Sequence, residues 1–379
     1  MISRPFWLNQ IENSWQKAPI VWLTGVRRVG KSTLCQELTD ALYFNCDLPR
    51  VADQLKDIEQ FYSQVKSKKI ILDEIHQLPD PSKILKIAAD SFPKLKILAT
   101  GSSTLSATQK FRDSLAGRKR VIHLLPVLAS ELAAFGSSDV RLRLLRGGLP
   151  QCLLSQDHDL SFYSEWLDSF YARDVQELFR IEKRSNFLKL IELLLRQSGG
   201  LIEITSLAKH AGLSRPTVMN YIEVLQITHA ITLIRPFAGG GRREIVAQPK
   251  AYGFDTGFVA YARSWTELRP TDLGPLWEHL VLETLRSFTP DKEIHFWRDK
   301  QQTEIDFVIP RNRSSIDAIE CKWSSTTTTT HNFKKFRANY PDGKNILVSN
   351  QEAETYIRTI EGLDIIFTNL LGLTNALKS

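Results

Sequence analysis

Two glycines, a lysine and a hydroxyl side chain lie close together near the start of the sequence, in the spacing Gly25-x-x-x-x-Gly30-Lys31-Ser32. Glycines at these places let the backbone curl so that its N–H groups point inward, which suits phosphate oxygens. An apolar segment precedes the loop and a helical pattern from Thr33 follows it, so a helix N-terminus adds positive charge. We expect Gly25, Gly30, Lys31, Ser32 and Thr33 to bind a nucleotide. Lys31 would contact the β- and γ-phosphates, and the Ser32 hydroxyl would bind Mg²⁺.

A pair of acids follows a second apolar segment, where residues 70–72 end at Asp73 and Glu74. The carboxyl end of a parallel strand is where ligands bind in open α/β sheets. We expect Asp73 to hold Mg²⁺ through water, and Glu74 to orient and activate the water that attacks the γ-phosphate. The sequence therefore predicts that the chain binds ATP with Mg²⁺ and hydrolyses it.

Small polar residues follow a third apolar segment, at Thr100, Ser102 and Ser103. The order of phosphate loop, Asp-Glu strand and polar-tipped strand resembles the AAA+ ATPases. The resemblance implies that one of the three hydroxyls contacts the γ-phosphate or the attacking water, and Ser102 is counted here among the nucleotide-binding residues. The residues themselves do not select one of the three, and a turn of small residues is the alternative for each.

The same resemblance implies roles for two arginines. Arg118 is the candidate for the arginine finger that such ATPases insert into a neighbouring subunit, so we expect a homo-oligomer. A solvated basic loop, or a phosphate contact to nucleic acid, is the alternative. Arg146 opens the segment 146–150, Arg-Gly-Gly-Leu-Pro, which resembles a turn that closes over the nucleotide. Arg146 is therefore a candidate nucleotide ligand, although glycine followed by proline can simply end a helix.

Residues 204–225 have the pattern of a helix-turn-helix, because Gly212 can end one helix and Ser214 can cap the next. The second helix would direct Arg215, Thr217 and Asn220 outward. A β-rich segment and a glycine run ending at Arg242 and Arg243 follow, and together these resemble a winged helix with a basic tip. Such a domain binds DNA, here mainly through backbone contacts, or serves only as a packing module.

Acids and a lysine lie on two alternating segments near the C-terminal end, at Asp306, Glu320 and Lys322. A hairpin of this length can bring the two acids together, and a strand places Glu320 and Lys322 on one face. Two carboxylates can hold Mg²⁺ against a phosphate while a lysine orients the attacking water.

This arrangement resembles the PD-(D/E)xK nucleases, although Ile305 stands where the family name has proline. The resemblance implies that an acid on the preceding helix completes the site, with Glu278 as first candidate and Glu283 as second. An ordinary charged surface hairpin is the alternative. A nuclease-like fold and nuclease activity are also separate claims.

The elements that carry these residues alternate between short apolar segments and helical patterns over residues 19–130. This alternation predicts a parallel sheet covered by helices on both faces. We therefore predict an α/β fold of the P-loop NTPase type with four parts: an AAA+ ATP-binding domain at 1–130, a helical lid or linker at 131–195, a winged-helix domain at 196–250 and an α/β nuclease-like domain at 251–379.

Bulk properties limit the classes further. The 379 residues carry a formal net charge of +7, which fits a polyanionic partner without requiring one. The 4 cysteines are scattered with no C-x-x-C pair, which argues against zinc ribbons and disulfide frameworks. No apolar stretch approaches the roughly 20 residues of a membrane helix, and no signal peptide is evident, so we expect a cytoplasmic protein without a membrane partner.

The motifs together resemble a broad family of prokaryotic AAA-type ATPases with a C-terminal nuclease-like domain. Residues 171–174, Tyr-Ala-Arg-Asp, belong to this resemblance, and we expect them only to pack a helix with an internal ion pair between Arg173 and Asp174. The prediction is an ATPase that acts on duplex or branched DNA, with Mg²⁺-dependent cleavage as a hypothesis. The alternatives are a DNA motor or clamp with an inactive nuclease fold, and a signalling ATPase that binds a protein partner.

Overall fold

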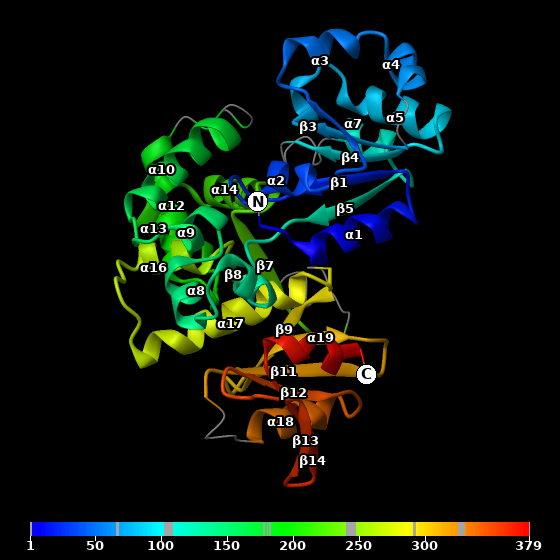
Figure 1. Ribbon diagram of the computed structural model, residues 1–379. Coiled ribbons are helices and arrows are strands. Elements are labelled where there is room, and N and C mark those ends of the chain that lie inside the picture. The colour runs from blue at the N-terminus through cyan, green and yellow to red at the C-terminus, as the bar shows by residue number, and fades with distance from the viewer. Residues whose placement is uncertain are drawn as a thin grey trace.

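The computed structural model describes residues 2–65, 68–101, 109–176, 179, 181, 183–239, 248–290, 293–324 and 330–378. Two β-sheets dominate the molecule, one near each end of the chain, and a group of helices lies beside and between them (Figure 1). None of the helices in these ranges combines the length and apolar character that a bilayer crossing requires.

The first sheet has five strands in the order β2-β3-β4-β1-β5, all parallel. Its strands are β1 (Ile20–Thr24), β2 (Leu42–Asn45), β3 (Lys69–Asp73), β4 (Lys96–Thr100) and β5 (Lys119–His123). The parallel sheet that the alternating pattern of residues 19–130 predicted is confirmed. Since β4 lies between β1 and β3, the carboxyl ends of three strands bring the phosphate loop, Thr100 and the two acids to one edge.

Successive side chains of β1 point to opposite faces of the sheet and pack in two separate hydrophobic cores. Trp22 packs with the helices α3 (Pro49–Gln54), α4 (Ile58–Gln64), α5 (Pro81–Ser91) and α7 (Gln109–Ser114). Val21 and Leu23 pack on the other face with the helices α1 (Pro5–Trp15) and α2 (Lys31–Gln36). Helix α1 was not predicted, although Trp7, Ile11 and Trp15 repeat every four residues and form its buried face.

The middle of the chain is helical. It contains η2 (Ala129–Phe135), α8 (Val140–Arg146), α9 (Pro150–Leu154), α10 (Ser161–Phe170), the π-helical turn η3 (Tyr171–Gln176) and α12 (Arg184–Arg196). Outside this middle region, a short helical turn, η1 (Ile75–Gln77), directly follows Asp73 and Glu74 at the end of β3. The predicted helix-turn-helix is formed by α13 (Ile204–Ala211) and α14 (Arg215–Ile227), with Gly212 in the left-handed region and the Ser214 hydroxyl accepting from the Thr217 N–H at 3.2 Å.

The second sheet has nine strands in the order β13-β14-β12-β11-β10-β9-β7-β8-β6. Three of them flank the helix-turn-helix: β6 (Gly200–Leu201), β7 (Ile231–Pro236) and β8 (Lys250–Gly253). The others are β9 (His295–Arg298), β10 (Glu304–Pro310), β11 (Ile316–Lys322), β12 (Asn345–Ser349), β13 (Tyr356–Ile360) and β14 (Leu363–Thr368). Strands β7 and β9 pair in parallel, so one sheet crosses the expected domain boundary at residue 250.

Helices cover both faces of the C-terminal part of this sheet. Helices α17 (Pro270–Arg286) and α19 (Leu370–Lys378) pack on one face, and α18 (His331–Asn339) packs on the other. Helix α16 (Thr256–Ala262) follows β8 and packs against α8 and α12. Helix α17 lies between the helical middle and the C-terminal sheet (Figure 1). One hydrophobic core runs continuously from α1 through these helices to α19, so the parts of the chain are packed as one body.

Candidate functional site

The phosphate loop joins β1 to α2 and depends on both of its glycines. Gly25 has φ +149°, and a Cβ there would lie 2.5 Å from the Leu124 carbonyl oxygen. Gly30 has φ +100°, in the region that favours glycine. The Lys31 Nζ donates to the carbonyl oxygens of Gly25 and Val26, at 3.0 and 3.1 Å, and burial lowers the pKa of this lysine. The loop therefore holds a desolvated ammonium ready to exchange carbonyl for phosphate oxygens.

A cavity of about 1130 Å³ opens above this loop. Gly25, Gly30 and the predicted ligands Lys31, Ser32 and Thr33 line it, and so does Glu74. Residues distant in sequence complete the wall, and they include Pro150, Phe170, Arg173, Asp174 and Thr228. The cavity is thus a joint product of the first sheet, the helical middle and the helix-turn-helix.

Thr100 organises the two acids. Its hydroxyl donates to an Asp73 carboxylate oxygen and accepts from the Glu74 N–H at 2.9 Å. The other Asp73 oxygen accepts from the Tyr43 hydroxyl at 2.5 Å. Glu74 lies in the left-handed region, at φ +57°, a strained conformation that is common at functional sites. Thr100 is therefore the sensor candidate with direct contacts, whereas Ser102 and Ser103 lie outside the described residues.

The environment of Glu74 suits a general base. Burial raises the pKa of its carboxyl group, while His76, whose Nδ1 lies 3.2 Å from a Glu74 oxygen, and Lys31 oppose the rise. A carboxylate of raised basicity beside a phosphate loop can accept a proton from an attacking water.

The oxygen donors near the loop suit Mg²⁺. Mg²⁺ takes oxygen ligands and commonly combines one or two carboxylates with water and substrate phosphates, and Ser32 and Asp73 supply a hydroxyl and a carboxylate. Within the described ranges, no group of three or more His, Cys, Asp or Glu side chains could hold a metal ion unaided. The donor set therefore fits a magnesium ion that arrives with the phosphates of the nucleotide.

An ion pair connects the loop to the π-helical turn η3. The Arg27 Nε donates to an Asp174 oxygen at 2.8 Å, and the Trp166 indole N–H donates to the Arg27 carbonyl oxygen at 3.1 Å. The expected ion pair between Arg173 and Asp174 is therefore wrong, because Asp174 pairs with the phosphate loop. Arg173 lines the cavity and is exposed there, without a hydrogen bond or ion pair to the described part of the chain.

We expect Arg173→Ala to raise the Kd for ATP about ten- to a hundredfold, because a hydrogen bond to a charged group contributes about 1.5–3 kcal/mol. Equilibrium binding of a fluorescent ATP analogue would measure the change. Arg184→Ala is the matched control, since Arg184 is exposed and pairs with Asp168 instead. An unchanged Kd in the Arg173 variant would remove this arginine from the site.

Two predicted arginines lie elsewhere. The Arg146 guanidinium donates to the carbonyl oxygens of Ser155 and Gln156, at 2.9 and 3.2 Å, and Arg146 does not line the cavity described above. The loop after α9 therefore holds its side chain outside the lining of this cavity, and its contact with the nucleotide stays a prediction. Pro150 from the same segment does lie over Gly30. Arg118 comes immediately before β5, at the amino end of that strand, and pairs with Asp90 at 2.6 Å, so its action on a neighbouring subunit stays a prediction.

The turn after α14 contacts the base of the phosphate loop. His229, at φ +61°, places its Nε2 3.0 Å from the hydroxyl of Thr24, the residue before Gly25. The His229 ring also lies 4.0 Å from the ring of His123 at the end of β5, and His123 contacts Arg286 of α17 at 3.1 Å. The nucleotide loop is thereby linked to both the helix-turn-helix and the C-terminal part.

A second polar cluster gathers at the face between α17 and the nine-stranded sheet. Burial, and then the neighbouring Glu320, raise the pKa of Asp306 to about 7. Burial, and then Asp306, raise the pKa of Glu278 to about 7. Lys322 lies 3.1 Å from Glu320. The structure therefore brings these four predicted residues to one place.

Lys250 was not predicted to belong to this cluster. Its Nζ lies 3.1 Å from Glu278 and 2.6 Å from Glu304, and the residue is 4% exposed. Although burial opposes its charge, Glu278, Glu304 and Asp306 raise the pKa of Lys250. Glu278 and Glu304 are thus paired with a lysine of the chain, and no metal-binding group of three or more acids, His or Cys side chains occurs here within the described ranges. Lys250 therefore pairs with Glu278, the acid that the nuclease resemblance expects to complete a magnesium site.

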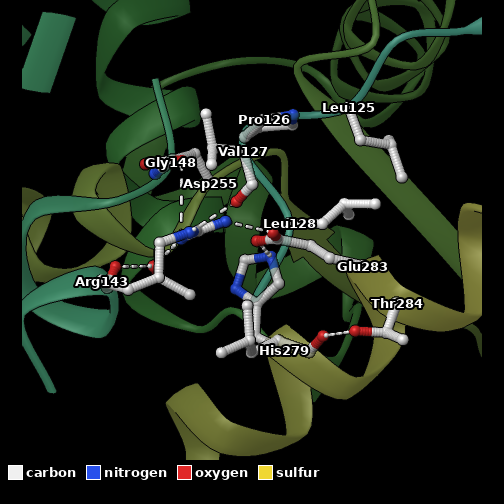
Figure 2. A network of polar contacts seen from close by, with 12 residues as sticks. Leu125, Pro126, Val127, Leu128, Arg143, Gly148, Asp255, His279, Glu283 and Thr284 are labelled. Atoms are coloured by element: carbon white, nitrogen blue, oxygen red, sulfur yellow. Dashed lines mark hydrogen bonds and ion pairs between the residues drawn. The ribbon is translucent and has the colours of Figure 1, made fainter. Parts of the chain in front are cut away.

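Glu283, the second candidate for the cluster, belongs to a different network around Arg143 (Figure 2). The fully buried Arg143 donates to Glu283, to the Val127 carbonyl oxygen at 2.9 Å and to the Thr256 hydroxyl at 2.9 Å. Asp255 lies 3.9 Å from the same guanidinium and accepts from the Gly148 N–H at 2.6 Å. Arg143 therefore fastens the segment after β5, the start of α16 and helix α17 to each other.

His279 in this network should make stability depend on pH. Burial lowers the pKa of His279 to about 3, although its Nε2 contacts the Gly253 carbonyl oxygen at 2.7 Å and Glu283 lies 4.0 Å away. The unfolded chain, with a histidine pKa near 6.5, binds a proton that the folded chain does not bind until about pH 3. Its stabilising contribution is therefore present above about pH 6.5 and is lost as the pH falls toward 3.

Between pH 7.5 and pH 5, this difference costs the wild type about 2 kcal/mol of unfolding free energy. Urea denaturation at the two pH values should show a smaller loss in His279→Gln than in the wild type. The raised pKa of Glu283 acts in the opposite direction in both proteins, so the comparison isolates the histidine. Equal losses in the two proteins would contradict the prediction.

Comparison with known families divides the chain into three. Residues 17–133 match a family described as "AAA domain". The match, with the five-stranded parallel sheet, supports an AAA+ P-loop ATPase. Residues 137–269 and 273–366 match two families, each described as "Domain of unknown function" (DUF8612 and DUF4143). The phosphate loop, the two acids and Thr100 all lie within the AAA domain.

Individual relatives add little about activity. An uncharacterized protein of Mycobacterium tuberculosis is 27% identical over 339 residues, which cover 86% of this chain and 75% of that protein. An uncharacterized protein of Haemophilus influenzae is 23% identical, with 97% of each chain covered. Among solved structures, Orc1 of Aeropyrum pernix in complex with DNA matches 70% of this chain and 92% of its own, at 12% identity and a TM-score of 0.32. Thermotoga maritima RuvB matches 62% and 90%, at 16% identity and a TM-score of 0.31. Likenesses this weak carry no argument about partners.

Several residues that complete the AAA domain's cavity were missed from the sequence. Arg27 stands at one of the unspecified positions of the Gly25-x-x-x-x-Gly30 pattern, and Asp174 lies 147 residues away from it. The Tyr-Ala-Arg-Asp segment was predicted only to pack a helix with an internal ion pair. One signal could have paired Arg27 with Asp174. It is a basic residue inside a phosphate loop together with a later acid that lacks a local partner.

Proposed function

We propose that the chain is an ATPase that acts on DNA, with the nucleotide state passed from the AAA domain to the parts that follow. The observation that supports this proposal is the composition of the cavity wall. Lys31 and Glu74 come from the AAA domain, and the region matched at residues 137–269 contributes Pro150, Asp174 and Thr228. A nucleotide in this cavity would touch both parts at once, so its hydrolysis would change the contacts between them.

The residues of the site support the following division of labour. Lys31 and the backbone of the loop would bind the β- and γ-phosphates, and Arg173 would add a second cation from the same chain. Thr100 holds Glu74 by its N–H, so that the carboxylate can orient and deprotonate the attacking water. Ser32 and Asp73 would hold Mg²⁺, which supplies charge neutralisation at the phosphates. Arg118 is proposed to act in trans in a homo-oligomer.

Binding of duplex or branched DNA is supported by the arrangement around α14. Helices α12, α13 and α14 with strands β6, β7 and β8 have the order of a winged helix, and Arg215 and Asn220 are exposed on α14. The net charge of +7 favours a polyanion. Thr217 and Asn220 also line a cavity of about 590 Å³ with Lys183. Arg242 and Arg243 lie outside the described residues.

DNA binding without cleavage is the second candidate, and one observation favours it. Lys250 pairs with Glu278, so the acid that should complete the metal site is already engaged. The C-terminal part would then bind or position DNA without cutting it.

ATP turnover by the purified protein, with and without linear, single-stranded and branched DNA, tests the proposal, with DNA integrity followed in the same samples. Lys31→Ala should abolish turnover, and DNA should stimulate the wild type in a salt-sensitive manner. Cleavage that is lost in Asp306→Ala would establish nuclease activity. If DNA neither bound nor changed turnover, the DNA proposal would fail and a protein partner would replace it.

A further inference from the structure

Three acids of the cluster on the nine-stranded sheet accept hydrogen bonds or ion pairs from the chain itself. Glu278 accepts from the Lys250 ammonium and, at 2.5 Å, from the Tyr252 hydroxyl. Glu304 contacts the same ammonium at 2.6 Å. Asp306 accepts from the Cys321 N–H at 2.7 Å. Each of these three half-buried carboxylates therefore already has a donor from the chain.

Lys250 is built into this place by the sheet. It pairs with Ile234 of β7 on one side and with Leu201 of β6 on the other, so two neighbouring strands fix its backbone. Its ammonium lies 5.4 Å from the centre of the Phe296 ring on β9, which adds a cation–π contact. A side chain held in this way is present at a high effective concentration and competes with any cation from solution.

We propose that the ammonium of Lys250 is the resident cation of the cluster formed by Glu278, Glu304 and Asp306, and that it engages Glu278, which the nuclease resemblance expects to complete a divalent metal site. The cluster is then a junction between the strands that flank the helix-turn-helix and the C-terminal part. Lys250 comes from the first of these and the three acids come from the second, so the ion pairs close the interface between two separately matched families.

The consequence is that the site should gain metal affinity when the lysine is removed. Without the ammonium, the half-buried Glu278 loses its ion-pair partner and Glu304 its nearest cation, and a divalent cation is the stronger replacement. We expect Lys250→Met to bind Mn²⁺ on the order of ten- to a hundredfold more tightly than the wild type, which follows from removing one nearby positive charge.

The experiment is a titration of Mn²⁺ into each protein without nucleotide, with free Mn²⁺ measured by its electron paramagnetic resonance signal. Omitting nucleotide separates this cluster from the ATP site, where the metal arrives with phosphates, so the result is independent of the proposed ATPase function. The double variant Lys250→Met/Asp306→Asn should lose the gain.

Lys69→Met is the matched control, because the Lys69 Nζ also lies between two carboxylates, of Glu12 and Asp40, at 2.7 Å from each. Glu12 and Asp40 are more exposed than Glu278 and Glu304. Removing Lys69 should therefore create no comparable affinity for Mn²⁺.

Two results would overturn the proposal. One is a wild-type protein that binds one Mn²⁺ without nucleotide and loses it in Asp306→Asn, since the cluster would then be a metal centre. The other is a folded Lys250→Met protein with no gain. If Lys250→Met does not fold, the comparison of wild type with Asp306→Asn still decides, and absence of a difference supports Lys250 as the resident cation.

Discussion

Replacing Arg143 with methionine should lower the free energy of unfolding by about 3–5 kcal/mol, the cost of removing one partner from a buried ion pair. Arg143 has no exposed surface, and its guanidinium contacts Glu283 and lies 3.9 Å from Asp255. Methionine has a similar length but no charge, so two buried acids would lose their counter-charge. Val127 would also lose a hydrogen bond to its buried carbonyl oxygen.

Chemical denaturation, followed by circular dichroism, would measure the change. Arg141→Met is the matched control, because Arg141 lies on the same helix but is exposed, and its loss should cost no more than about 0.5 kcal/mol. Adding Glu283→Gln to Arg143→Met should recover part of the stability, since the buried charge is then removed. If the two single arginine variants were equally stable, the network in Figure 2 would not hold the segment after β5, α16 and α17 together.

Glu74→Gln should reduce ATP turnover by about 10²–10⁴-fold, the usual contribution of a positioned general base. Glutamine keeps the size and the backbone hydrogen bond to Thr100 but cannot accept the proton of water. The Kd for ATP should therefore change little, while kcat falls. This separation of binding from turnover is what distinguishes loss of a base from collapse of the cavity.

Steady-state phosphate release and equilibrium binding of the nucleotide are the two measurements. Glu59→Gln serves as the control, because Glu59 is exposed on α4 and does not line the cavity. Turnover that persists within about tenfold of wild type would place the base on another residue of the cavity.

Local patterns were enough to predict the centre of the nucleotide site. The phosphate loop, the five strands and the two acids are each set by a few neighbouring residues, and the parallel sheet brings strand ends together without further information. The hydrogen bonds of Thr100 to Asp73 and Glu74 could not be predicted from the sequence, because they depend on β4 lying beside β3.

The parts that the sequence did not predict are contacts between distant segments. Asp174 could pair with any nearby cation, and only the fold brings it to Arg27. Arg146 carries a suggestive motif, but two backbone carbonyls hold its side chain. Lys250 is a lysine in a strand, which normally indicates an exposed position, and its burial follows from acids more than 25 residues away.

The continuity of the nine-stranded sheet limits how these proteins can be rearranged by recombination. The two regions on either side of residue 270 match separate families, as if either could be inherited alone. Yet β7 of one pairs with β9 of the other, so a chain that contained only one region would expose an unpaired strand edge. Unpaired edges promote aggregation, so we expect either region expressed alone to be less soluble than the two together.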